Sequence, residues 1–154
     1  MSEHRYHVDG YSEAPPEVVF DVLVDGPGWA GWAPGLKAAS YECEGEPAPH
    51  GVGAIRRFGA GKGPVSREQV VAYDRPGYFS YVSLSGPLPW HDYRSEVRLT
   101  PGPAGVGTRI DWTGSFRSRM PGLGTFIHRM VAGFARGLVS ESEHRAATGS
   151  TTPS

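Results

Sequence analysis

The sequence predicts an α+β protein in which an antiparallel sheet of about seven strands is covered by one long C-terminal helix. Three observations predict this fold class. Glycine- and proline-rich turns divide most of the chain into short apolar stretches, and two of these stretches alternate apolar and polar residues with a period of two. The last long segment instead repeats its apolar residues at spacings of three and four. The first two patterns are typical of strands, and the third is typical of an amphipathic helix.

The N-terminal part predicts one strand followed by an element whose type the pattern leaves open. Residues 4–12 alternate weakly and fit a first strand. Ser12 as N-cap, with prolines at 15 and 16, favours the start of a helix. Residues 18–24 are rich in valine, however, and fit a strand equally well. The glycine- and tryptophan-rich connection 26–35 leaves room for one turn or a very short helix.

The middle of the chain predicts a meander. Candidate strands lie at residues 37–46, 52–59, 65–74, 78–85, 90–100 and 107–116, with turn residues between them. In 90–100, His91 and Tyr93 share one face with Ser95, while the opposite face is charged. In 107–116, Trp112 likewise lies on the apolar face. This pattern indicates a sheet with one face exposed to solvent and the other face covered by another element.

The covering element is the last long segment. Its apolar stripe comprises Leu123, Phe126, Ile127, Met130, Val131, Phe134 and Leu138. The spacing predicts an amphipathic helix of roughly 24 residues, about 36 Å long. Residues 147–154 are low in complexity and predict a disordered tail.

The order of these elements is similar to that of the SRPBCC superfamily, which includes START-like lipid-binding domains and polyketide cyclase/dehydratases. The matching stretches are Ala14–Leu23, Gly51–Arg57, Arg67–Val71 and Gly107–Trp112. The resemblance covers residues 4–146 as a single domain. It implies a helix-grip fold: a curved sheet wrapped round the long C-terminal helix, two short helices after the first strand, residues 15–24 helical, and an internal cavity.

The resemblance also implies two functions. The first is binding of a hydrophobic or amphipathic small molecule, such as a lipid, a polyketide or an aromatic metabolite, in that cavity. The alternative is a polyketide cyclase/dehydratase-like enzyme in which His, Tyr, Arg or Glu side chains of the cavity transfer protons. The sequence contains no motif that decides between them.

The candidate ligand-binding residues are mostly aromatic. Those expected to point inward are Trp32, Phe58, Tyr81, Tyr93, Trp112, Phe126, Met130 and Phe134. A solid core and a cavity wall both fit this set. Arg56 and Glu68 lie on strands expected to be neighbours, so they could meet on either face of the sheet. His91, with Tyr93 on the same predicted face, is the candidate catalytic residue because histidine titrates near neutrality.

Composition limits the partners. The chain carries 15 basic and 16 acidic residues, for a net charge of −1, so no overall basic field favours nucleic acid. It lacks an apolar run of about 18 residues, which argues against stable membrane insertion. Cys43 is the only cysteine, and the N-terminus does not resemble a signal peptide, so we expect a cytoplasmic protein. No motif predicts a metal or a cofactor, and a homodimer is left open.

Overall fold

The computed structural model describes residues 1–149. Its elements are β1 (Ser2–Ser12), α1 (Pro16–Val24), the 3₁₀ helix η1 (Pro27–Gly31), β2 (Ala38–Cys43), β3 (Ile55–Gly59), β4 (Ser66–Asp74), β5 (Tyr78–Ser85), β6 (His91–Pro101), the 3₁₀ turn η2 (Pro103–Gly105), β7 (Thr108–Ser118) and α2 (Leu123–Thr148). Each predicted strand is present, with its ends shifted by a few residues. The two short helices after β1 are α1 and η1.

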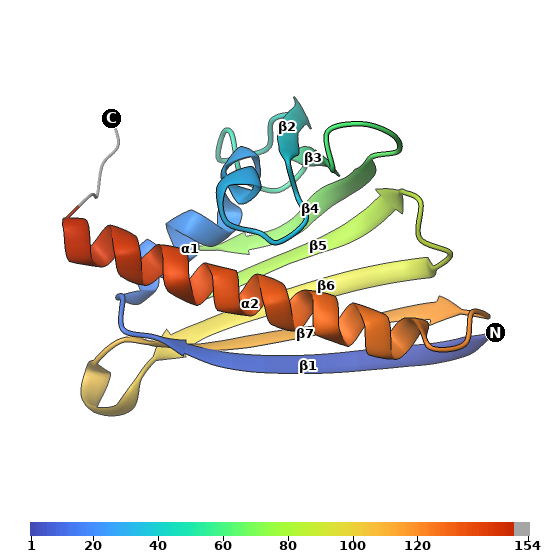
Figure 1. Ribbon diagram of the computed structural model, residues 1–154. Helices are drawn as coiled ribbons and strands as arrows, with labels where there is room; N and C mark the ends of the chain where they lie inside the picture. The colour runs from blue at the N-terminus through green and yellow to red at the C-terminus, as the bar shows by residue number, and fades with distance from the viewer. Residues whose placement is uncertain (150–154) are drawn as a thin grey trace.

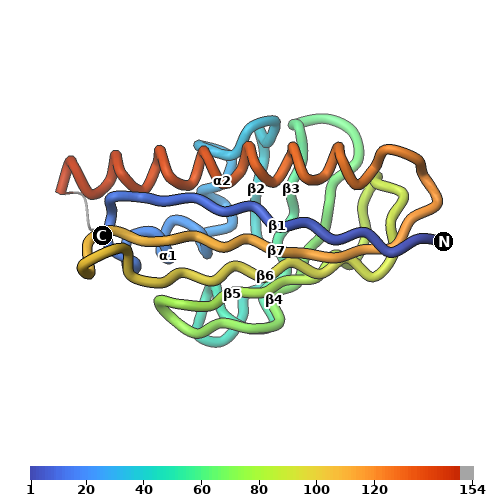
Figure 2. Tube along the Cα trace, turned by 90° about the horizontal axis from the view of Figure 1, so that it is seen from below, coloured from blue at the N-terminus to red at the C-terminus, as the bar shows by residue number. Residues whose placement is uncertain are grey.

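One antiparallel sheet contains all seven described strands, in the order β1-β7-β6-β5-β4-β3-β2. Strands β2 to β7 form a meander in chain order. The last strand, β7, pairs with the first strand, β1, along the whole length of both. The sheet is curved, and α2 lies across it on the concave side (Figure 1). Seen from below, α2 runs beside β1 (Figure 2). This arrangement confirms the helix-grip fold.

Tertiary packing decides the segment that the sequence left ambiguous. Residues 16–24 form α1, which begins at Pro16, where the missing N–H of proline is tolerated. Its side chains Val19, Phe20 and Leu23 are fully buried. The valines that favour a strand are therefore held in a helix by burial of a whole face, which outweighs a small propensity difference.

Helix α2 buries one stripe and ends later than predicted. Leu123, Ile127, Val131, Phe134 and Leu138 point into the core. The helix continues through residues 147 and 148, which the sequence assigned to the tail. Gly149 then ends it in a left-handed conformation, a common helix terminus. Residues 150–154 of the predicted tail lie outside the described part.

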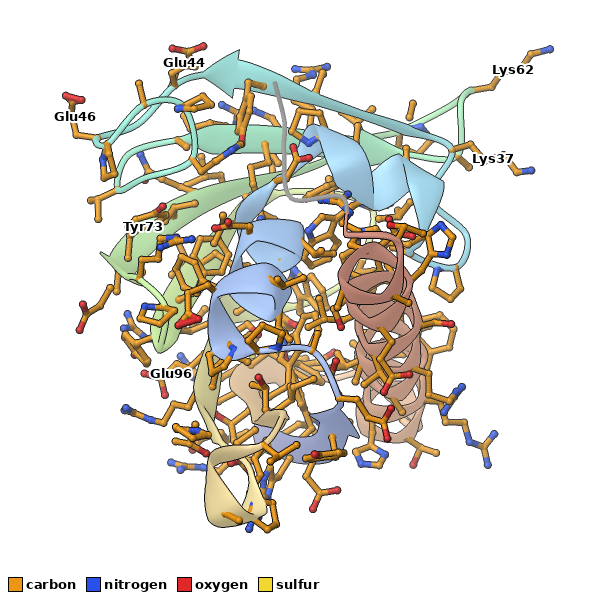
Figure 3. All side chains as sticks on the ribbon, turned by 90° about the vertical axis from the view of Figure 1, so that its left-hand side faces the viewer. Lys37, Glu44, Glu46, Lys62, Tyr73 and Glu96 are labelled. Carbon is orange, nitrogen blue, oxygen red and sulfur yellow. The ribbon has the colours of Figure 1, made fainter. Side chains whose placement is uncertain are left out.

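Side chains from the sheet and both helices meet between them (Figure 3). At the far edge of the sheet, Glu44 and Glu46 project on one side, and Lys37 and Lys62 on the other. None of the helices within residues 1–149 is long and apolar enough to cross a membrane.

Candidate functional site

Arg56 and Glu68 form the charged centre of the concave face. They lie directly opposite each other on β3 and β4, and Arg56 Nη2 donates to Glu68 Oε1 over 2.9 Å. The Arg56 side chain is 0% exposed and that of Glu68 is 15% exposed. The prediction that Arg56 and Glu68 meet on neighbouring strands is confirmed. Both side chains point to the concave face of the sheet.

Four aromatic rings enclose the Arg56 guanidinium. Its carbon lies 4.8 to 5.2 Å from the ring centroids of Trp29, Phe58, Phe79 and Tyr81. Such cation–π contacts stabilise a desolvated guanidinium. Gly26 makes room for the stem of the side chain, because a Cβ there would lie 2.9 Å from Arg56 Cδ.

The charged pair is incompletely satisfied. Within the described residues, Arg56 Nε and Nη1 are buried and have no hydrogen-bond partner. Burial raises the pKa of Glu68 above its ordinary value of 4.5, while the charge of Arg56 opposes this rise. The interior therefore holds two unused donors beside a carboxyl group whose pKa is raised by burial.

A chain of hydroxyl groups continues across the same face. Tyr6 Oη lies 2.5 Å from Tyr93 Oη and donates to Ser95 Oγ over 3.0 Å. Ser95 Oγ also accepts from Trp112 Nε1 over 2.8 Å. Burial raises the pKa of Tyr6 to about 12 and that of Tyr93 well above 10, so both hydroxyls stay protonated at neutral pH. Since Tyr6 donates to Ser95, the hydroxyl of Tyr93 donates to Tyr6, and the Tyr93 oxygen is left to accept a hydrogen bond from a ligand.

Gly114 explains how Tyr6 reaches this chain. Tyr6 on β1 pairs with Gly114 on β7, yet its hydroxyl contacts residues of β6, one strand further along. A Cβ at Gly114 would lie 2.3 Å from Tyr6 Oη. The missing side chain thus allows the ring of Tyr6 to cross β7.

Trp29 fills the space between these polar groups and α2. Its indole ring lies 4.9 to 6.4 Å from those of Trp32, Phe58, Tyr81, Trp112 and Phe134. The indole N–H donates to the carbonyl oxygen of Leu23 over 2.7 Å. The predicted internal cavity is not confirmed, because the indole ring of Trp29 lies where the aromatic side chains of the sheet and α2 come together.

Most of the predicted aromatic residues do come together. Phe58, Tyr81, Tyr93, Trp112 and Phe134 are buried in one cluster, and Trp32 and Met130 are half-buried against it. The exception is Phe126, which is 55% exposed. Its prediction as an inward residue was wrong because it lies at the edge of the apolar stripe of α2, where the helix surface turns toward solvent.

His91 also does not belong to this cluster. It is exposed and pairs with Arg117, whereas Arg94 pairs with Ser115, so β6 carries one extra residue between the two pairs. Asp92 adopts a positive φ of 55° at this bulge. A bulge reverses the alternation of side chains, so His91 and Tyr93 do not share a face, and the predicted role of His91 inside a cavity has no geometric support.

Sequence reasoning missed Tyr6, Trp29 and Ser95. Tyr6 and Ser95 have inward parity on predicted strands, and that parity is the signal that could have identified them. Trp29 lies in a glycine-rich connection that offers no periodicity.

A second polar pair lies next to Arg56, because Tyr41 on β2 pairs with Arg56 on β3. Tyr41 on β2 hydrogen-bonds through Oη to Nδ1 of His50 in the loop between β2 and β3. Burial raises the pKa of Tyr41 to about 12 and lowers that of His50 below 6.5. Both groups are therefore neutral at pH 7. Within residues 1–149, no three His, Cys, Asp or Glu side chains are arranged to hold a metal ion.

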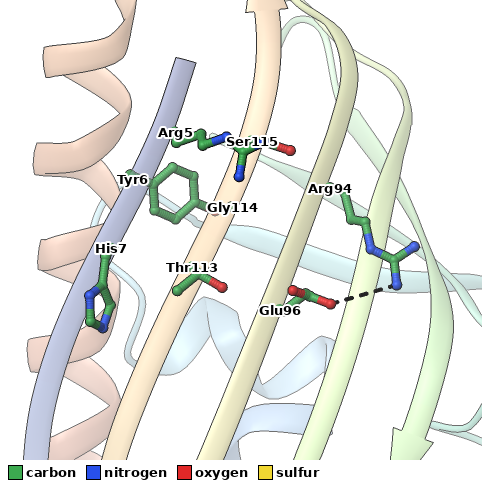
Figure 4. Close-up of a pocket in the computed structure, with 8 residues that line it drawn as sticks. All are labelled: Arg5, Tyr6, His7, Arg94, Glu96, Thr113, Gly114 and Ser115. Carbon is green, nitrogen blue, oxygen red and sulfur yellow. Dashed lines mark ion pairs between the residues drawn. The ribbon is translucent and has the colours of Figure 1, made fainter. Parts of the chain in front are cut away.

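The outer face of the sheet carries a separate hollow (Figure 4). Its walls are Arg5 and His7 from β1 and Arg94 and Glu96 from β6, the last two forming an ion pair of 3.8 Å. These groups are largely exposed, so water screens them. The hollow is open, and Tyr6 and Gly114 also line it.

The concave face thus defines a helix-grip protein with a polar line in an aromatic interior. Residues 4–147 match the family described as polyketide cyclase / dehydrase and lipid transport, and the chain belongs to this family. Membership implies a ligand-binding or cyclase role. No curated protein matches the sequence.

Three solved structures share the fold. The ZhuI aromatase/cyclase from Streptomyces sp. R1128 is 19% identical, with a TM-score of 0.79 over 97% of this chain and 100% of that one. A START superfamily protein from Mycobacterium smegmatis is 13% identical, with a TM-score of 0.72 over 96% and 99%. A protein from Nitrosospira multiformis is 19% identical, with a TM-score of 0.76 over 93% and 99%.

Proposed function

We propose that this protein binds an amphipathic, ring-containing small molecule between the concave face of the sheet and α2. The observation that carries the proposal is the line of inward polar groups within an aromatic interior. Arg56, Glu68, Tyr81, Tyr93 and Ser95 come from four consecutive strands. Specific small-molecule sites are commonly built in this way, from apolar walls with a few placed polar groups.

The polar line indicates how such a ligand is oriented. Its ring system packs against Trp112 and Phe134, and its carbonyl or hydroxyl group faces the hydroxyls of Tyr81 and Tyr93. Glu68 is the charged group with residual exposure, so a polar atom of the ligand meets Glu68 before Arg56. Membership in a family described by polyketide and lipid chemistry supports this choice of ligand class.

Binding requires the indole ring of Trp29 to move out of the space that the ligand would occupy. Trp29 is carried by the five-residue η1 and is held by one hydrogen bond to Leu23 as well as by its ring contacts. A ligand ring that replaces the indole recovers much of the same aromatic contact, which limits the free-energy change of the exchange. The net charge and the single cysteine favour a cytoplasmic place for this binding.

A second function is favoured by one observation, the raised pKa of Glu68 beside Arg56. A carboxyl group whose pKa is raised by burial is protonated more readily than an exposed one, so it can donate a proton and take it back, as the dehydration steps of a cyclase/dehydratase require. Arg56 would stabilise the carboxylate that forms. In this function Glu68, rather than His91, transfers the proton.

The experiment is native mass spectrometry of the protein purified from its own host. We expect a retained compound with a ring system or acyl chain, released when the protein is denatured. A protein that carries nothing and binds neither fatty acids nor flat aromatic compounds would contradict the proposal. With the retained compound as substrate, Glu68→Gln should abolish turnover but not binding if the cyclase function holds.

A further inference from the structure

One end of the molecule exposes apolar side chains around a hollow. Met120, between β7 and α2, is 51% exposed, and Phe126, in the first turn of α2, is 55% exposed. Leu88 and Trp90 from the β5–β6 connection are half-buried, and they line a hollow of about 660 Å³ together with Met120 and Arg119. We call Leu88, Trp90, Met120 and Phe126 the apolar end. It lies opposite the β6–β7 hairpin (Figure 1).

The charges around the apolar end are basic. Residues 112–140 contain four arginines and no aspartate or glutamate, although the whole chain has a net charge of −1. Within the described residues, neither Arg119 nor Arg129 forms an ion pair with an acidic side chain. The acidic residues Asp92 and Glu3 at this end form ion pairs, Asp92 with Arg117 over 3.4 Å and Glu3 with Arg5 over 3.3 Å. The net charge of the whole chain therefore does not reflect the basic charge of Arg119 and Arg129 at this end.

Apolar side chains surrounded by guanidinium groups match the boundary between lipid headgroups and acyl chains. Phe, Trp, Leu and Met side chains enter that boundary, while arginines attract anionic headgroups. A second copy of the chain fits this surface poorly, because a two-fold contact would bring two copies of the same basic patch together. We propose that the apolar end docks reversibly on a bilayer surface that contains anionic lipid.

The apolar end contacts the interior through Trp90, which stacks on Tyr93 at 4.1 Å, so the test leaves Trp90 unchanged. Arg119, Arg129, Met120 and Phe126 do not contact Arg56, Glu68 or the hydroxyl chain through any hydrogen bond or ion pair within residues 1–149. Docking and interior binding can therefore be measured separately on the same protein.

The test is cosedimentation of the full chain with phosphatidylcholine vesicles that contain or lack phosphatidylglycerol. We expect binding only with phosphatidylglycerol, weakened by added salt. Arg119→Glu with Arg129→Glu should reduce it at least tenfold, given a contribution of about fivefold per basic residue. Met120→Glu with Phe126→Glu should reduce it at least tenfold through lost apolar burial.

Matched controls lie at the opposite end of the sheet. The control variants are Val106→Glu and Arg109→Glu. Val106 is 60% exposed in the β6–β7 hairpin, and Arg109 is also exposed. Both should bind vesicles like the original protein. Equal loss in the control variants, equal binding to phosphatidylcholine alone, or no binding at all would overturn the proposal. Unchanged unfolding curves and unchanged binding of an interior ligand would show that the variants leave the fold and the proposed function intact.

Discussion

Arg56 and Glu68 face each other across β3 and β4 at 2.9 Å, and this ion pair is the only one among the described residues that lies on the aromatic concave side. A buried pair of charges is held together by its own attraction and by the lack of water to replace either partner. The pair therefore links the stability of the sheet to the proposed binding site.

Replacing Glu68 with alanine should lower the free energy of unfolding by roughly 3–5 kcal/mol, because Arg56 would remain charged without a partner. Denaturant unfolding at neutral pH measures this change. Glu42→Ala is the matched control: Glu42 pairs with Arg57 and Arg67 on the wet face, where water screens the charges. An equal loss of stability in both variants would show that the ion pair of Glu68 contributes no more than a solvent-exposed one, which would contradict this prediction.

Stability should also depend on pH through Glu68. Burial raises its pKa above 4.5 in the folded protein, so the folded state binds more protons than the unfolded state at pH values from 4.5 up to the folded pKa. The free energy of unfolding contributed by Glu68 is then fully present below pH 4.5 and is lost as the pH rises. Relative to the original protein, Glu68→Gln should gain stability with rising pH. A constant difference between the two unfolding curves at all pH values would rule out this linkage.

Gly114→Ala should destabilise the protein by about 1–3 kcal/mol, because the new methyl group meets the hydroxyl of Tyr6 and pushes the ring off β7. The hydroxyl chain to Ser95 and Tyr93 should break at the same time. Gly31→Ala is the control, since a methyl group there meets nothing within 4 Å. Thermal unfolding compares the two variants, and similar midpoints would show that the close approach of Tyr6 is not required.

Trp29→Ala should cost roughly 3–5 kcal/mol, as is usual for loss of a buried aromatic side chain. It should also leave a void beside Arg56 that admits flat compounds such as indole or naphthalene, and these should raise the unfolding temperature of the variant alone. Trp90→Ala, at a half-buried position, serves as the control. Calorimetry with and without indole checks both effects. A variant that indole does not stabilise would indicate that the interior collapses instead.

The fold could be predicted because its signals are local and repeated. Alternation in residues 90–100 and 107–116 and the apolar stripe of α2 each follow from backbone geometry. The meeting of Arg56 and Glu68 could be predicted as well, since parity and a meander bring neighbouring strands together.

The remaining features depend on a β-bulge and on contacts between distant segments, and the residue pattern of a single strand does not predict either. The bulge at Asp92 inverts the face of His91, and nothing in residues 90–100 marks it beforehand. Trp29 lies in a connection whose place is set by distant rings. Tyr6 reaches its partners only because Gly114, on another strand, leaves a gap. These are long-range packing relationships, and they can be recognised only when the pairing of the strands is known.

The four tryptophans allow the most direct test of interior binding, since each contributes one indole N–H signal to a ¹⁵N-resolved NMR spectrum. The indoles of Trp29 and Trp112 lie inside, and that of Trp90 lies at the apolar end. Titration with naphthol and with a fatty acid should shift the Trp29 and Trp112 signals saturably for at least one of the two compounds. Binding that moves only the Trp90 signal, or titrations that leave both interior signals unmoved, would contradict a binding site between the sheet and α2.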